Sequence, residues 1–168
     1  DFITLYGGLH VTYDAVSYYG IARAHELNFD KLAIPSYHFD KADVVVSFGA
    51  DFLGTWLSPV QFAKDYTQNR NIKSGKMSRH FQVESLLSTT GAVADVRLPI
   101  NPSQEGAALM NLYNKVAKAL GKPEMAGVPA FNVAGNQLDR MATELAAAAG
   151  RSLVVSGSND IVIQQIVN

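Results

Sequence analysis

One nearly continuous run of β-branched and aromatic residues constrains the fold of this chain more than any other feature. It is the segment 42–49, Ala-Asp-Val-Val-Val-Ser-Phe-Gly, which ends at Gly49. An apolar run of this length is typical of a strand that is buried on both faces, as in parallel sheets. Parallel strands need crossover connections, which are usually helices. The run therefore predicts an α/β fold.

Similar segments recur along the chain, and most of them end at a glycine or a proline. Further strands are predicted at 10–14, 77–84, 94–100 and 151–157, and helices at 15–28, 58–68, 106–120, 136–149 and 159–167. Pro99 and Pro102 make the strand at 94–100 edge-like, and Ser103 is the expected N-cap of the helix that follows. Because most strands lead into a helix through a short turn, we expect a Rossmann-like α/β fold, with a mostly parallel sheet and helices on both faces.

The segment 122–133 is the expected linker of the chain. It would separate a Rossmann-like α/β unit at 1–121 from the start of a second α/β unit at 134–168. The strands at 42–49 and 151–157 would then belong to two neighbouring sheets. The chain starts without Met and ends inside a predicted helix, so we expect it to be a fragment of a longer subunit.

Composition argues against several functional classes. There are 14 Lys and Arg residues against 15 Asp and Glu residues, with no basic run, so the electrostatic footprint of a nucleic-acid binder is missing. No apolar run approaches the roughly 18 to 20 residues of a membrane span, so direct membrane insertion is not expected. With no cysteine and four histidines that lack ligand spacing, these residues predict no metal site, and no motif identifies a catalytic residue.

Two glycine turns are the candidate ligand sites. Ligands of open parallel sheets bind beyond the carboxyl ends of the strands, where glycine lets the backbone approach a phosphate. The turns after 42–49 and 151–157 carry Gly49 with Asp51 and Gly157 with Asp160. Neither turn has a dinucleotide or Walker A motif, so a tight turn is the simpler interpretation of each glycine. For His80, solvated loop polarity is favoured over anion binding.

Three longer segments together resemble the molybdopterin oxidoreductase family. They are YDAVS at 13–17, YHFDKADVVVSFGAD at 37–51 and ADVRLPINP at 94–102, and the resemblance covers nearly the whole chain in order. The segments ADFLGTWLSP at 50–59 and MSRHF at 77–81 are similar to the large iron–sulfur subunit of alternative complex III. That complex is a membrane-bound bacterial quinol:cytochrome c oxidoreductase.

The resemblance adds a third turn to the candidate cofactor site. Family members that bind molybdopterin guanine dinucleotide carry Pro-Gly-Thr-Asp where this chain has 102–105, Pro-Ser-Gln-Glu. Ser103 adds a side chain where glycine leaves room, and Glu105 is one methylene longer than aspartate. The cofactor-binding residues that the resemblance implies, vestigial or real, are Gly49, Asp51, Pro102, Ser103, Gln104, Glu105, Gly157 and Asp160.

These departures imply a family member that has kept the fold and lost the cofactor. The expectation is a non-catalytic scaffold domain of an electron-transfer complex, with no cofactor in this segment and iron–sulfur clusters elsewhere in the full-length subunit. Its partners would be other subunits of a respiratory complex, including cytochrome c subunits, at the periplasmic face of the bacterial inner membrane. Two alternatives stay open: an active oxidoreductase domain that binds molybdopterin guanine dinucleotide, and a stand-alone nucleotide-binding module.

Overall fold

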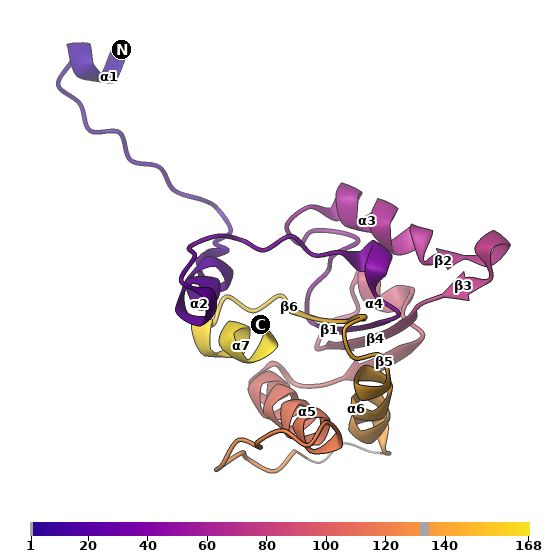
Figure 1. The fold of residues 1–168 in the computed structure, drawn as a ribbon. Helices are drawn as coiled ribbons and strands as arrows, with labels where there is room; N and C mark the ends of the chain where they lie inside the picture. The colour runs from indigo at the N-terminus through magenta and orange to yellow at the C-terminus, as the bar shows by residue number, and fades with distance from the viewer. Residues whose placement is uncertain (1, 132–134) are drawn as a thin grey trace.

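A single sheet of four parallel strands forms the centre of the computed structural model, which describes residues 2–131 and 135–168 (Figure 1). The sheet order is β5–β4–β1–β6. The strands are β1 (Val44–Phe48), β4 (Arg79–Glu84), β5 (Val96–Pro99) and β6 (Ser152–Ser156). A short antiparallel ribbon of β2 (Arg70–Asn71) and β3 (Lys76–Met77) lies outside it. The predicted α/β class with a parallel sheet is confirmed.

Helices cover both faces of the sheet. One face carries α2 (Tyr19–Phe29) and α3 (Pro59–Gln68), and the other carries α5 (Glu105–Ala119), α6 (Gln137–Ala147) and α7 (Ile161–Val167). The remaining helical segments are short: α1 (Phe2–Leu5), α4 (Thr89–Ala92), and the 3-10 turns η1 (Phe39–Lys41), η2 (Ile72–Ser74) and η3 (Pro102–Gln104).

The apolar core consists of two layers that meet at β1. Val44, Val46 and Phe48 pack toward α5 and α6, whereas Val45 packs toward α3, because side chains alternate along a strand. All five residues of β1 are buried. The prediction from the continuous apolar run, that this strand is buried on both faces, is therefore confirmed.

The order in which successive strands join the sheet reverses at β1, because later strands are added first on one side of β1 and then on the other. From β1 it passes outward through α3 to β4 and then to β5, and it returns through α5 and α6 to pair β6 with the other side of β1. Counted in chain order, these four strands read 3-2-1-4, which is the beginning of the doubly wound dinucleotide-fold order. Ligands of such sheets bind where the order reverses, at the carboxyl ends of β1 and β6.

β6 does not start a second sheet, so the expectation of a second α/β unit at 134–168 is wrong. β6 pairs with β1 in parallel over five positions, from Val44 opposite Ser152 to Phe48 opposite Ser156. The apolar run at 151–157 completes the sheet that β1 begins, and α6 shares one core layer with α5. Of the expected linker 122–133, residues 132 and 133 lie outside the described residues, as does residue 134. In the described part, Met125 N donates to Asn114 Oδ1 of α5 at 2.7 Å.

The strand expected at 10–14 is not formed. Residues 6–17 instead extend from the body as an arm that ends in α1 (Figure 1), and α2 begins at Tyr19 rather than at Ala15. The β-type residues Leu9, Val11 and Tyr13 are 86%, 69% and 87% exposed. A strand needs a neighbouring strand for its backbone hydrogen bonds, and the structure places none beside this segment.

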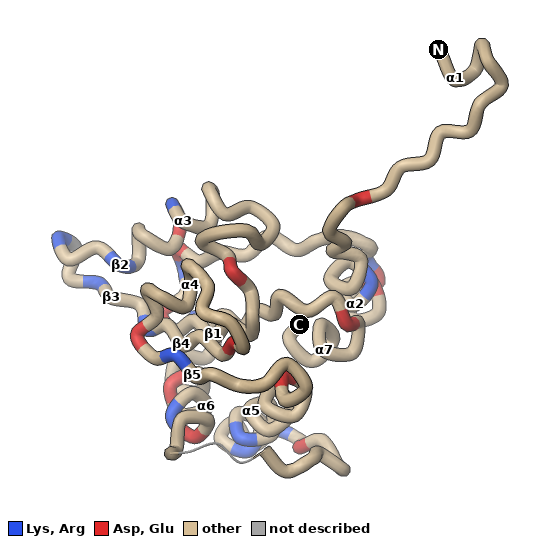
Figure 2. The backbone as a smooth tube through the Cα atoms, turned by 180° about the vertical axis from the view of Figure 1, so that it is seen from behind, with Lys and Arg blue, Asp and Glu red and all other residues tan. Residues whose placement is uncertain are grey.

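Charged residues are distributed over the body without a block of one sign (Figure 2). In the described ranges, no helix combines the length and the apolar character that crossing a membrane requires.

Candidate functional site

The carboxyl ends of β1 and β6 meet at Gly49 and Gly157. Gly49 has φ +61°, a conformation that favours glycine, and its N–H donates to Val83 O at 2.8 Å. The N–H of Gly157 donates to Phe48 O at 2.8 Å. A Cβ atom on Gly157 would lie 2.5 Å from the carbonyl oxygen of Gly49. The two turns therefore lie against each other on the side of Gly157 where a Cβ atom would project.

Asp51 points toward α4 instead of the reversal point. Its Oδ1 atom accepts hydrogen bonds from Thr90 Oγ1 at 2.7 Å and Thr90 N at 3.0 Å. Thr90 Oγ1 in turn accepts from Leu53 N at 2.9 Å. The carboxylate thus fastens the turn after β1 to the turn after β4.

The 102–105 turn reaches the end of β6 only through Glu105. Gln104 folds back, so that its Oε1 atom accepts from Asn101 N at 2.9 Å, while Pro102 and Ser103 are exposed. The expectation that Ser103 is the N-cap of α5 is therefore wrong, because the N-cap position is held by Gln104. Glu105 accepts from Ser156 Oγ at 3.1 Å, and burial raises the pKa of its carboxyl group despite that bond.

Asp160 is the N-cap of α7. Its Oδ1 atom accepts from Val162 N at 2.8 Å and from Ile163 N at 3.1 Å. These backbone N–H groups are the donors that an anion at a helix N-terminus would use. Sequence analysis assigns Asp160 to a candidate ligand turn, whereas in the structure its carboxylate accepts hydrogen bonds from the first turn of α7.

Replacing Asp160 by alanine is expected to lower the free energy of unfolding by about 1 kcal/mol, because the N–H groups of Val162 and Ile163 lose their acceptor. Asp160→Asn keeps a side-chain oxygen at the same position and is expected to retain most of the stability. Urea unfolding of the two variants beside the unchanged chain measures the difference. Equal stability of all three would show that the cap contributes nothing.

The three turns do not fit molybdopterin guanine dinucleotide. Its phosphates would find the N–H groups of Val162 and Ile163 already bonded to Asp160, and the turns at 49–51, 102–105 and 157–160 contain no Lys or Arg. They would meet the carboxyl groups of Glu105 and Asp160 instead. Of the eight residues singled out, only Gly49, Gly157 and Glu105 lie at the reversal point of the sheet. No cluster of His, Asp and Glu side chains suited to a metal ion occurs among the described residues.

A buried chain of hydrogen bonds runs along one face of β4. Tyr66 Oη lies 3.0 Å from His80 Nδ1, His80 Nε2 lies 3.2 Å from Gln82 Oε1, and Gln82 Nε2 donates to Glu84 Oε2 at 3.1 Å. Since the Gln82 amide nitrogen donates to Glu84, its oxygen must accept from His80 Nε2. His80 Nδ1 is then the acceptor of the Tyr66 hydroxyl proton. Because the Glu84 carboxylate can only accept a hydrogen bond, it determines the donor and acceptor at every step of this hydrogen-bond series.

The charge states fit this arrangement. Burial lowers the pKa of His80 to about 4, so the ring is neutral at pH 7. Burial alone would raise the pKa of Glu84, but hydrogen bonds from Arg97 and Ser88 outweigh it, and the net shift is downward. His80 therefore belongs to a strand interior, and its interpretation as solvated loop polarity is wrong.

The pairing of the candidate residues with their partners carried no signal in the sequence. Thr90 lies 39 positions from Asp51, and Ser156 lies 51 positions from Glu105. The one usable signal was the i, i+2, i+4 spacing of His80, Gln82 and Glu84, which places three polar side chains on one face of a strand.

Comparison of the chain with protein-family models and with curated proteins finds no match. The fold is that of an α/β protein whose four parallel strands follow the start of the dinucleotide-fold order, and whose turns after β1 and β6 lie against each other.

Proposed function

We propose that this chain is a non-catalytic, molybdopterin-oxidoreductase-like scaffold domain of a membrane-bound electron-transfer complex of the quinol:cytochrome c oxidoreductase type. The observation that carries the proposal is the internal use of the candidate cofactor residues. Asp51 bonds to Thr90, Asp160 caps α7, and Gly157 lies against the backbone of Gly49. A fold that keeps the strand order of a cofactor domain, with these candidate residues bonded internally, is suited to support rather than to chemistry.

The sequence resemblance supports the choice of complex. The segments at 37–51, 50–59, 77–81 and 94–102 include β1, β5 and parts of β4, together with the turn after β1. In this proposal, the iron–sulfur clusters lie elsewhere in the full-length subunit, and no nucleic acid or direct membrane insertion is involved. The partners are other subunits of the respiratory complex, including cytochrome c subunits, at the periplasmic face of the inner membrane.

The surface of the body supports a role in subunit contact. Leu27 and Phe29 near the end of α2, with Leu32 and Ile34 in the loop that follows, are each about half exposed. Large apolar side chains at close positions on one segment are typical of surfaces that another protein covers.

The proposal is tested by purifying the subunit from its native membrane in a mild detergent through an affinity tag. We expect covalently bound haem of cytochrome c type to co-purify in a fixed ratio to the tagged subunit through two further chromatographic steps. The same subunit with Leu27→Asp, compared with Val60→Asp on the exposed side of α3, tests whether the α2 end contributes. A tagged subunit that purifies without any haem-bearing partner would contradict the proposal.

A further inference from the structure

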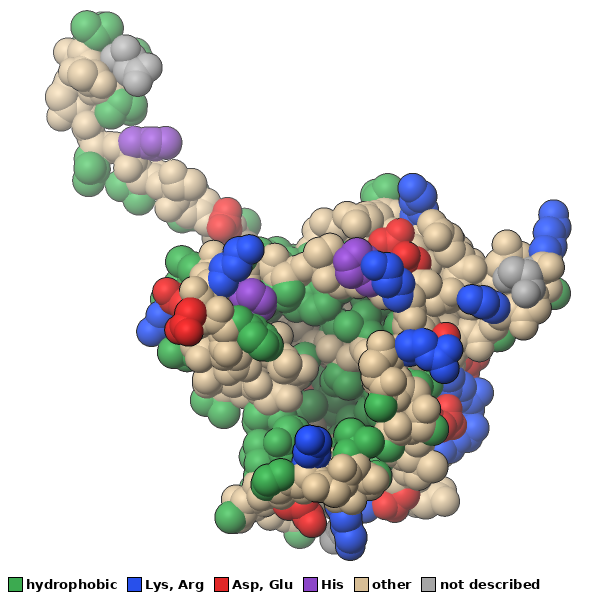
Figure 3. All heavy atoms as spheres, viewed as in Figure 1, with side chains coloured by type: hydrophobic (Ala, Val, Ile, Leu, Met, Phe, Trp, Pro, Cys, Tyr) green, Lys and Arg blue, Asp and Glu red, His purple; other side chains and the backbone are tan. Residues whose placement is uncertain are grey.

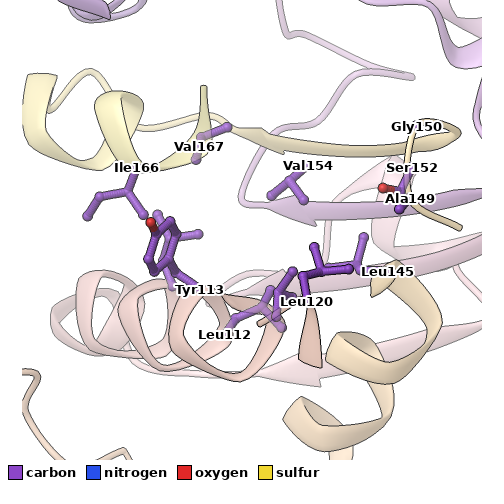
Figure 4. A pocket seen from close by; sticks show the side chains of 12 residues that line it. Leu112, Tyr113, Leu120, Leu145, Ala149, Gly150, Ser152, Val154, Ile166 and Val167 are labelled. Atoms are coloured by element: carbon purple, nitrogen blue, oxygen red, sulfur yellow. The ribbon is translucent and has the colours of Figure 1, made fainter. Parts of the chain in front are cut away.

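The outer edge of β6 borders an apolar hollow. β6 pairs with β1 on one side, and no described strand pairs with its other side. A cavity of about 250 Å³ lies between β6, α5, the end of α6 and α7 (Figure 4), within the apolar depression at the centre of Figure 3. Its lining includes Leu112, Val116, Leu145, Val154 and Ile166.

A second hollow, of about 280 Å³, lies on the opposite side of the same edge. It is lined by polar and basic side chains that include Ser36, His38, Lys41 and Arg151. Both hollows include Gly150 and Ser152, so together they flank the first half of β6. A strand added to this edge would place alternate side chains in an apolar and in a polar environment.

The arm of this chain carries the matching pattern. Leu9, Val11 and Tyr13 are apolar and exposed, and they alternate with His10, Thr12 and Asp14. Residues 2–18 contain Asp14 and no Lys or Arg (Figure 2). On the rim of the polar hollow, Arg151 already lies 2.8 Å from Asp43, so Lys41 is the cation that we expect Asp14 to meet.

The direction in which the arm leaves the body indicates whether it binds the apolar hollow of its own chain or that of a second copy. Tyr18 is held at the turn after β1, where its hydroxyl group accepts from Leu57 N at 3.3 Å, and its ring packs with the core layer on the α3 side. The apolar hollow lies on the α5 side of the sheet. The arm accordingly leaves the body and points away from the hollow (Figures 1 and 3).

We propose that the outer edge of β6 binds the arm segment 9–14 of a second copy of this chain as an added strand. Leu9, Val11 and Tyr13 then enter the apolar hollow, and Asp14 meets Lys41. Two copies that exchange arms reciprocally form a closed dimer, in which both open edges are paired. This inference does not depend on the proposed function.

Cysteine trapping tests the exchange directly, because the chain contains no cysteine. Chains with a single cysteine at position 9, 11 or 13 are mixed with Tyr113→Cys chains, whose cysteine lies at the wall of the apolar hollow. Under mild oxidation we expect at least one arm position to yield five or more times as much mixed disulfide as Val60→Cys, an exposed valine on α3. Equal yields from all four partners would overturn the proposal.

Sedimentation equilibrium gives an independent readout. We expect the 168-residue chain to dimerise with increasing concentration, and Val11→Asp to weaken the association at least tenfold, whereas Val60→Asp leaves it unchanged. A monomer throughout the micromolar range would overturn the proposal. So would an intramolecular disulfide in dilute chains that carry both Val11→Cys and Tyr113→Cys, because the arm would then occupy its own hollow.

Discussion

Replacement of Gly157 by alanine is expected to destabilise the chain by about 3 kcal/mol. The new Cβ atom would lie 2.5 Å from Gly49 O and 2.9 Å from Gly49 C, and both atoms belong to a backbone that is itself bonded to β4. The three nearest atoms belong to the backbone and not to a flexible side chain, so β1 and β6 must separate at their carboxyl ends. Urea unfolding followed by the fluorescence of Trp56, which is buried in the core, measures the loss.

Gly106→Ala is the matched control for Gly157→Ala. A Cβ atom on Gly106 would meet no other atom within 4 Å, and the residue lies in α5, where alanine is favoured over glycine by about 0.5–1 kcal/mol. We therefore expect this variant to be as stable as the unchanged chain or more so. If both variants match the unchanged chain, then the two turns are not in contact in solution, and the space at Gly157 is open to a ligand.

Acidification from pH 6.5 to pH 4.5 is expected to lower the free energy of unfolding by about 2 kcal/mol through His80 alone. In the folded chain burial lowers the pKa of His80 to about 4, whereas an unfolded histidine has its ordinary value near 6.5. Between these values the unfolded state binds a proton that the folded state does not, so stability falls as the pH falls. The contribution of His80 is fully present above pH 6.5.

Urea unfolding between pH 7 and pH 4.5 checks this dependence with two variants. His80→Gln removes the titrating ring and is expected to flatten the slope of stability against pH, whatever it costs in absolute stability. His10→Gln, on the exposed arm, is expected to keep the slope of the unchanged chain. An identical slope for His80→Gln and the unchanged chain would contradict the burial of His80. The comparison stops at pH 4.5, because the lowered pKa values of Glu84 and Asp95 add their own loss of stability in more acidic solution.

The elements that the sequence predicted well are those whose pattern is local. The run at 42–49 is β1, and the proline-limited segment at 94–100 is the edge strand β5. Gly121 and Gly150, both at positive φ, follow the ends of α5 and α6. In each case the residue types within fewer than ten positions are enough to predict the burial or the backbone conformation of the segment.

The features that the sequence did not predict depend on contacts between distant residues. Asp51 meets Thr90 across 39 positions, and Glu105 meets Ser156 across 51. The polar residues of β4 looked unsuited to a buried strand, and only the position of Tyr66 on α3 shows how His80 is satisfied. The segment 10–14 has the residues of a strand but no partner strand, which no local pattern reveals. Its exposed apolar residues are the reason to look for a partner in a second copy.

Metal and pterin analysis of the full-length membrane-bound subunit that we propose, purified from its source cells, tests the central claim most directly. Elemental analysis quantifies molybdenum, tungsten and iron, and fluorescence after oxidation detects pterin. The account predicts iron without stoichiometric molybdenum, tungsten or pterin, because Glu105 is bonded to Ser156, Asp160 caps α7, and the three turns carry no Lys or Arg. Stoichiometric molybdenum or tungsten together with pterin would contradict it and assign these turns to a cofactor.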